Sequence, residues 1–171
     1  FALVKTATES ADEGIIKALR NSSAAFGRSE EIDYMGRSLL LLLIKNPTGL
    51  NQIIQTYLTK EKDRLLVFVI NDNYADGRDV SWLWDAALED LKEYKGKIVV
   101  GGVRAADMAL RLKYAGLQDI LVQPDNSKLV DTIMENSTKR SKVFVLPTYT
   151  AMLDIRAKLT AKNNDKREYW K

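Results

Sequence analysis

Short apolar stretches alternate with longer amphipathic ones along most of this chain, and this alternation limits the possible folds more than any other feature. The apolar stretches have the length and the Val, Ile and Leu content of buried strands. The predicted strands are Glu31–Tyr34, Arg37–Ile44, Leu65–Ile70, Lys97–Val100, Ile120–Val122 and Lys142–Leu146. The predicted helices between and after them are Leu50–Leu58, Ser81–Tyr94, Ala105–Ala115, Ser127–Asn136 and Thr150–Thr160. Such an order predicts an α/β fold, Rossmann-like and three-layered, with a mainly parallel sheet.

The loops that follow the parallel strands are expected to lie together. Right-handed crossovers place all strand-to-helix loops along one edge of such a sheet. Here that edge would carry Asn46, the acidic loop 71–85, Gly101–Gly102 and Pro147–Thr148. We expect the last of these to start a helix, with Thr148 or Thr150 as its cap. A functional site built on the sheet is therefore expected at this edge.

Composition limits the chemistry that the chain can perform alone. Its 171 residues include no His and no Cys, which excludes disulfides, thiolate zinc sites and a complete Ser-His-Asp or Cys-His arrangement. The net charge of +3 is mild and does not favour a nucleic-acid partner. The longest apolar run, Leu39–Ile44, is too short to span a bilayer. Because the sequence starts at Phe1 without Met, we expect a fragment of a longer polypeptide.

The loop from Asn71 to Asp85 concentrates the chemistry, because it places acidic residues and two Trp after a buried strand. An EF-hand counted from Asp72 fails, since Tyr74 and Leu83 stand where oxygen ligands are required. Magnesium shared with a nucleotide phosphate is not supported by the spacing. Two interpretations of Asp79 remain open. It could orient a histidine of another chain, if held stiffly and partly shielded from water, or it could only cap the following helix.

Three further segments have a functional and a structural interpretation. Gly101–Gly102 leads from a strand into a helix, where free backbone N–H groups can bind an anion, but the motif is incomplete and a tight turn is the favoured interpretation. Arg28 and Lys45 could face a nucleotide held by a preceding domain, or be solvated surface charges. The sequence around residues 8–19 predicts a helix, with Thr8 or Ser10 as its cap.

Several strings of residues resemble one family in their order along the chain. They are Phe26-Gly-Arg-Ser-Glu30, Lys45-Asn-Pro-Thr-Gly49, Asn71-Asp-Asn-Tyr-Ala-Asp-Gly-Arg-Asp-Val-Ser-Trp-Leu-Trp-Asp85, Gly102-Val-Arg-Ala-Ala-Asp107 and Leu146-Pro-Thr-Tyr-Thr-Ala-Met152. This order is similar to that of the MurT family, the Mur-ligase-like subunits of lipid II isoglutaminyl synthases. The resemblance implies a Mur ligase C-terminal domain over residues 25–161, preceded by the tail of a central ATP-binding domain (1–24) and followed by a polar tail (162–171).

The resemblance also implies a two-protein cytoplasmic enzyme that acts at the inner face of the membrane. The ligase subunit would use ATP and Mg²⁺, bound mainly by its central domain, to activate the α-carboxylate of D-glutamate in lipid II. The partner, the glutaminase GatD, would supply ammonia with its own Cys and His, giving D-isoglutamine. Matching the motif assigns the aspartate lent to that Cys-His pair to Asp79, with Asp76 as the fallback.

Similarity to Mur ligases further places three residues near the nucleotide. Arg28 would face the phosphates, and Lys45 and Asn46 would lie close by. No residue of this chain is expected to bind a metal. One departure concerns the strand Leu39–Ile44, which lacks the Asp that many Mur ligases carry there, so ribose binding by this domain is not expected. A docking module without catalytic function and an autonomous nucleotide-binding domain are the alternative hypotheses.

Overall fold

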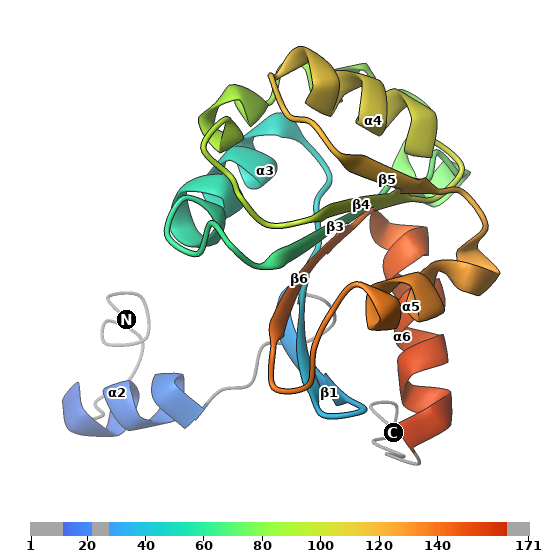
Figure 1. Ribbon diagram of the computed structural model, residues 1–171. Helices are drawn as coiled ribbons and strands as arrows, with labels where there is room; N and C mark the ends of the chain where they lie inside the picture. The colour runs from blue at the N-terminus through green and yellow to red at the C-terminus, as the bar shows by residue number, and fades with distance from the viewer. Residues whose placement is uncertain (1–11, 22–27, 164–171) are drawn as a thin grey trace.

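A six-stranded sheet organises the molecule (Figure 1). The computed structural model describes residues 12–21 and 28–163, and of residues 18–21, 28, 162 and 163 it describes the backbone alone. The strands are β1 (Arg28–Tyr34), β2 (Arg37–Leu42), β3 (Leu65–Val69), β4 (Ile98–Gly101), β5 (Ile120–Gln123) and β6 (Lys142–Pro147). Their order in the sheet is β1-β2-β6-β3-β4-β5. All neighbours are parallel except β1 and β2, so the predicted, mainly parallel sheet is confirmed.

Helices cover both faces of the sheet and form the outer layers (Figure 1). One face carries α3 (Pro47–Ile53), which continues as a π-helical turn to Leu58, and α4 (Ala105–Tyr114). The other face carries α5 (Asn126–Glu135) and α6 (Tyr149–Asn163). The three-layer α/β fold is therefore as predicted.

Alternating side chains of the central strands supply the two halves of the core. On β3, Phe68 points to the α3 and α4 face, whereas Val67 and Val69 point to the α5 and α6 face. All three are fully buried, as are the parallel neighbours Phe144 and Val145 on β6. A strand buried on both faces must be apolar along its whole length, which explains the continuous apolar run in the sequence.

A tight hairpin joins β1 and β2. Met35 and Gly36 form its two-residue turn, and their φ angles of 51° and 75° are both positive. Positive φ at both central residues is the geometry of the type I′ turn, which matches the twist of the flanking strands. The antiparallel β1 therefore closes one edge of an otherwise parallel sheet.

The predicted helix from Ser81 to Tyr94 is wrong. The segment instead forms two 3-10 turns, Ser81–Trp84 and Leu88–Leu91. A tertiary contact holds this conformation: the guanidinium of Arg111 on α4 binds the carbonyl oxygens of Leu83 and Ala86, at 3.1 and 2.8 Å. The Ala86 carbonyl also accepts from the Leu88 amide at 2.8 Å, so the break between the two turns is fixed by both backbone and side-chain donors.

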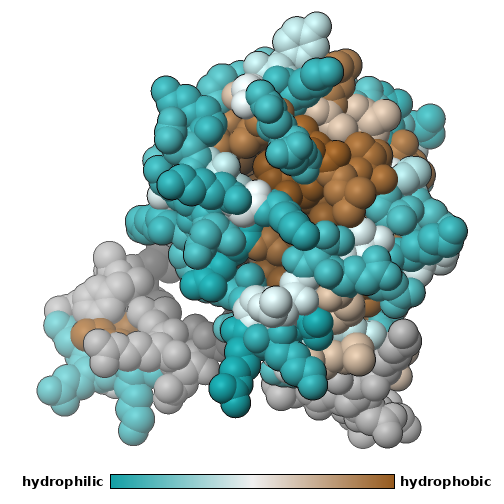
Figure 2. All heavy atoms as spheres, viewed as in Figure 1, coloured by the Kyte–Doolittle hydropathy of each residue, from teal (hydrophilic) through white to brown (hydrophobic). Residues whose placement is uncertain are grey.

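The opposite edge of the sheet is apolar and uncovered. Among the residues that the structure describes, strand β5 pairs only with β4, and its residues Leu121 and Val122 are both exposed. Figure 2 shows an apolar patch over this part of the molecule. The edge strand therefore presents both apolar side chains and unpaired backbone groups.

Predictions for the two ends are tested only in part. The predicted first helix is present as α2 (Asp12–Asn21), with Asp12 and Glu13 in its first turn. Its proposed caps, Thr8 and Ser10, lie outside the described residues, as does the tail beyond Asn163. The division into a central-domain tail and a C-terminal domain remains a prediction.

Candidate functional site

The site is built at the crevice between β3 and β6. These neighbouring strands lead to opposite faces of the sheet, since the turns after β3 pack on the α3 and α4 face while α6 packs on the other. In open α/β sheets, ligands commonly bind at such a reversal, outside the carboxyl ends of the strands. Here the predicted common edge is present: the Ile44 amide donates to the Pro147 carbonyl at 2.9 Å, and the Ile70 amide to Gly101 at 3.0 Å.

Side chains of the protein itself bridge this crevice. The Asn71 amide N–H donates to Thr148 Oγ1 at 3.0 Å, and Asn71 Nδ2 donates to Thr150 Oγ1 at 3.0 Å. Asn71 Oδ1 accepts from the Val103 amide at 3.2 Å. Asn71 therefore joins the carboxyl ends of three adjacent strands, β3, β6 and β4. This network fixes the root of the acidic loop, a role that its position in the sequence did not reveal.

Asp76 lies inside the acidic loop and is only 9% exposed. Its carboxylate accepts from the Thr150 amide at 2.7 Å, the Thr150 hydroxyl at 2.6 Å and the Asn73 amide at 3.1 Å. Thr148 precedes α6 as predicted, and its carbonyl accepts the first helical bond from the Met152 amide at 2.8 Å. Its hydroxyl, however, accepts from the Asn71 amide, and the side chain that binds the Thr150 amide of the first turn is that of Asp76. Asp76, the fallback for a partner-facing carboxylate, is occupied within its own chain.

Asp79 is exposed, so its own chain does not shield it from water. Its Oδ1 accepts from the Ser81 amide at 2.8 Å, and its Oδ2 is 3.0 Å from Ser81 Oγ. Donation by the Ser81 amide, followed by that of its hydroxyl, lowers the pKa of the carboxyl group. Both carboxylate oxygens thus bind Ser81, the first residue of the 3-10 turn, and these two bonds orient the side chain as an anion. A carboxylate has about four acceptor positions, so further donors can still bind it.

An exposed aromatic pair joins the segment of Asp79 to helix α4. Trp84 is 50% exposed and meets Tyr114 of α4, which is 71% exposed, edge-on with ring centroids 5.5 Å apart. The Arg111 guanidinium lies 5.5 Å from the centroid of the Trp84 ring. By contrast, Trp82 packs partly buried against the core. Exposed aromatic side chains of this kind are frequent at protein interfaces.

Arg111 is the structural residue that the sequence did not single out. Its side chain is buried, and besides the two carbonyl groups it binds the exposed carboxylate of Glu89 at 2.9 Å. The hydrogen bond from Arg111 lowers the pKa of Glu89. Arg111 therefore fastens the segment that follows Asp79 onto helix α4. A polar residue on an otherwise apolar helix face was the only sequence signal for it.

The turn at Gly101–Gly102 is a packing device. Gly102 has a φ of 89°, and a Cβ there would lie 2.3 Å from the carbonyl oxygen of Ile70. The next two amide groups, of Val103 and Arg104, already donate to Asn71 and Ile70. These N–H groups are not available to an anion, so the tight-turn interpretation holds.

The residues expected near a nucleotide are only partly suited to it. Lys45 is exposed and could offer a positive charge to phosphate. Asn46 uses its side-chain oxygen to cap α3, accepting from the Gly49 amide at 2.8 Å. Arg28 begins β1, and its side chain lies outside the described residues. Within residues 12–21 and 28–163, no cluster of acidic side chains could hold a metal ion, and the turn around Lys45 contains no carboxylate.

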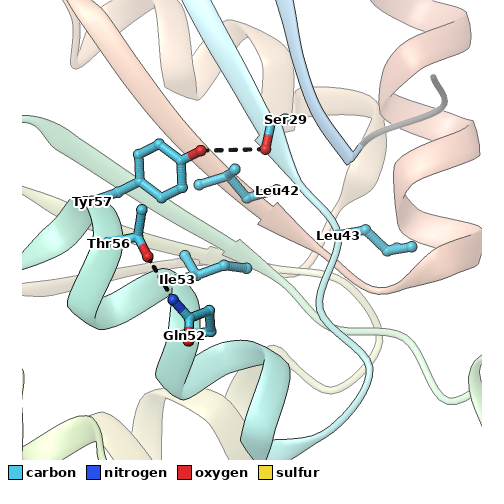
Figure 3. A pocket seen from close by; sticks show the side chains of 7 residues that line it. All are labelled: Ser29, Leu42, Leu43, Gln52, Ile53, Thr56 and Tyr57. Carbon is cyan, nitrogen blue, oxygen red and sulfur yellow. Dashed lines mark hydrogen bonds between the residues drawn. The ribbon is translucent and has the colours of Figure 1, made fainter. Parts of the chain in front are cut away.

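A separate pocket of about 290 Å³ lies beside this turn but excludes Lys45 and Asn46. Figure 3 shows the Tyr57 hydroxyl facing Ser29, at 3.3 Å, and Gln52 facing Thr56. Its lining carries no charged group and consists of Ser29, Leu42, Leu43, Gln52, Ile53, Thr56 and Tyr57. The pocket therefore does not coincide with the residues predicted to face phosphates.

Solved structures with the same fold define the class. MurC, the UDP-N-acetylmuramate-alanine ligase of Thermotoga maritima, superposes with a TM-score of 0.63 at 12% identity, over 96% of this chain and 36% of that protein. MurF of T. maritima, solved with ADP, gives 0.61 at 16% identity, over 97% and 37%. The fold is that of the C-terminal domain of Mur ligases.

Sequence comparison then gives the particular family. The profile described as MurT ligase C-terminal matches residues 43–152. The MurT subunit of the lipid II isoglutaminyl synthase of Streptococcus pneumoniae is 35% identical over 92% of this chain, and that of Staphylococcus aureus is 34% identical over 74%. This chain belongs to the MurT family, and it spans about a third of the length of these relatives, 36% and 29%. No helix in the described part of the chain is long and apolar enough to cross a membrane.

Proposed function

We propose that this chain is the C-terminal domain of the ligase subunit of a lipid II isoglutaminyl synthase, and that it presents Asp79 to the Cys-His pair of a glutaminase partner, GatD. The complex amidates the α-carboxylate of D-glutamate in the lipid II stem peptide with ammonia from glutamine. The observation that carries the role of Asp79 is its geometry: an exposed anion in one orientation, on a chain that has no histidine.

The chemistry asked of Asp79 is modest and suits this geometry. In a nucleophile-His-Asp arrangement, the carboxylate orients the imidazole and stabilises its cation, without transferring a proton itself. Asp79 is ionised at neutral pH, as an ordinary aspartate is, and the hydrogen bonds from Ser81 lower its pKa further. Its exposed oxygens can accept the imidazole N–H once a partner covers the loop. That partner supplies the shielding that the isolated chain lacks, and it would rest against the nearby Trp84 and Tyr114.

ATP and Mg²⁺ belong to the central domain of the same subunit in this proposal. When bound there, they activate the D-glutamate carboxylate towards ammonia. Arg28 and Lys45 would contribute positive charge towards the phosphates from this side, with Asn46 fixing the turn that presents Lys45. The metal must be held elsewhere, since this turn has no carboxylate. The bound ADP of MurF and the AMPPNP and Mn of the Yersinia pestis folylpolyglutamate synthase are consistent with nucleotide use by this fold.

The test is Asp79→Asn in the complex of the full-length subunit with its glutaminase. We expect glutamine hydrolysis to fall on the order of 10⁴-fold, as for the equivalent change in a serine protease triad. Docking, measured by calorimetry, should be unchanged. Asp125→Asn is the matched control, because exposed Asp125 caps α5 through the amide and hydroxyl of Ser127 in the same way. It should leave hydrolysis unaffected.

Two outcomes separate the alternatives. If Asp79→Asn docks and hydrolyses glutamine normally, the domain is a docking module and all glutaminase chemistry lies in the partner. Calorimetry with ATP on this 171-residue chain tests the autonomous nucleotide-binding hypothesis. We expect no binding, because the amides at the Gly101–Gly102 turn are engaged internally.

A further inference from the structure

Asp76 is a buried carboxylate for which the proposed chemistry has no use. Its hydrogen bonds all run to its own chain: two from Thr150, through the amide and the hydroxyl, and one from the Asn73 amide. Thr150 Oγ1 in turn accepts from Asn71 Nδ2 at 3.0 Å and from Asn73 Nδ2 at 2.9 Å. A buried anion whose donors come from two separate segments resists displacement.

These bonds attach the acidic loop to helix α6. The Thr150 amide lies in the first turn of this 15-residue helix, whose N-terminal end attracts negative charge. The loop and the helix are more than 70 positions apart in the chain, so this contact is purely tertiary. Asp76 therefore determines where the acidic loop stands relative to the sheet edge.

Asp79 follows Asp76 after only Gly77 and Arg78. Gly77 has a φ of 89°, a left-handed conformation that glycine adopts readily. We propose that Asp76 is a positioning residue, whose clamp on Thr150 fixes the point from which the Asp79 carboxylate reaches the partner. This inference rests on the proposed function of Asp79 and adds the residue that sets its position. Arg111 fastens the segment on the other side of Asp79, so the carboxylate is held from both ends.

Replacement of Asp76 by an asparagine shows why the charge matters. In the Asp76→Asn variant, the one remaining side-chain oxygen could still accept from the Thr150 amide. The new NH₂ group, however, would face the Thr150 hydroxyl and the Asn73 amide, where the carboxylate now accepts two hydrogen bonds. The loop must shift to separate these donors. A displacement of about 1 Å in a catalytic arrangement can cost on the order of 100-fold in rate.

The experiment uses the full-length subunit in complex with its glutaminase. For Asp76→Asn we expect kcat for glutamine to fall roughly 10- to 100-fold with KM unchanged, since the glutamine site lies in the partner. Thr150→Val, which removes the hydroxyl, should give the same loss, and Thr150→Ser, which keeps it, should restore the wild-type rate. Amidation driven by ammonium chloride bypasses the glutaminase and should stay within about two-fold of wild type, which a generally damaged domain would not allow.

The double variant Asp76→Asn, Asp79→Asn gives the clearest readout. A residue that acts only through Asp79 should cost nothing further once Asp79 is removed. The inference is overturned if Asp76→Asn keeps the wild-type kcat, if Thr150→Ser is as damaging as Thr150→Val, or if ammonium-driven amidation falls in proportion. These results differ from failure of the proposed function, in which Asp79→Asn alone keeps full glutamine hydrolysis.

Discussion

Substitution of Arg111 by Met offers the sharpest test of how the segment after Asp79 is held. The unbranched apolar side chain preserves much of the packing of the arginine stem, while the two hydrogen bonds to the Leu83 and Ala86 carbonyl groups disappear. Each hydrogen bond from a charged group contributes about 1.5–3 kcal/mol, so the gross loss is about 3–6 kcal/mol. The variant no longer buries a charge, and the desolvation cost that this avoids offsets part of the loss. We expect a net destabilisation of about 3 kcal/mol.

The assay is urea unfolding of the 171-residue chain, followed by circular dichroism. Arg104→Met is the matched control, because Arg104 stands at the start of the same helix and pairs with the partly exposed carboxylates of Asp72 and Asp107. Ion pairs of that kind contribute less than about 1 kcal/mol. If the two substitutions reduce the free energy of unfolding equally, then Arg111 does not fasten the segment as we infer.

Three further predictions concern local chemistry. Ser81→Ala removes the hydroxyl but keeps the amide donor, so the pKa of Asp79 should rise only part of the way towards 3.8. Carboxyl ¹³C NMR titration measures this pKa, and no rise would mean that the Ser81 hydroxyl does not bind the Asp79 carboxylate. Gly102→Ala should lower the urea midpoint far more than Gly116→Ala: both have a φ of 89°, but only at Gly102 would a Cβ meet a carbonyl oxygen, at 2.3 Å. Burial raises the pKa of Tyr94 well above 10.0, so the folded state retains this proton more tightly and stability should fall as the pH rises above about 10. Tyr94→Phe should abolish that component of the alkaline loss, and an unchanged pH profile would contradict the assignment.

The sequence was sufficient for the layers of the fold and insufficient for its detailed connections. Apolar strands such as Leu65–Val69 are recognisable because burial on both faces demands continuous apolar residues. The 3-10 turns from Ser81 to Leu91 were missed, and a side chain distant in sequence, Arg111, holds this segment through the carbonyl groups of Leu83 and Ala86. Local periodicity carries no information about such a contact.

For the candidate site too, the sequence was sufficient for the location of a residue and insufficient for its contacts. The position of Asp79 beside the sheet edge follows from the order of strands and loops, and its exposure agrees with a partner-facing role. The burial of Asp76, three residues earlier, and its hydrogen bonds from Thr150 could not be predicted. Both are aspartates in one polar loop, and only the fold brings Thr150 to one of them.

The placement of β6 affects how the chain can fold during synthesis. Strand β6 lies between β2 and β3, and Ser38 of β2 pairs with Lys142, about a hundred positions later. Until the ribosome has released β6, the hairpin β1-β2 and the three strands β3-β4-β5 cannot join. Each of these two partial sheets then exposes one bare apolar border, the kind of surface on which nascent chains aggregate. We therefore expect a chain truncated before Lys142 to form insoluble material. In the chain that includes β6, this strand inserts last between β2 and β3 and joins the two partial sheets.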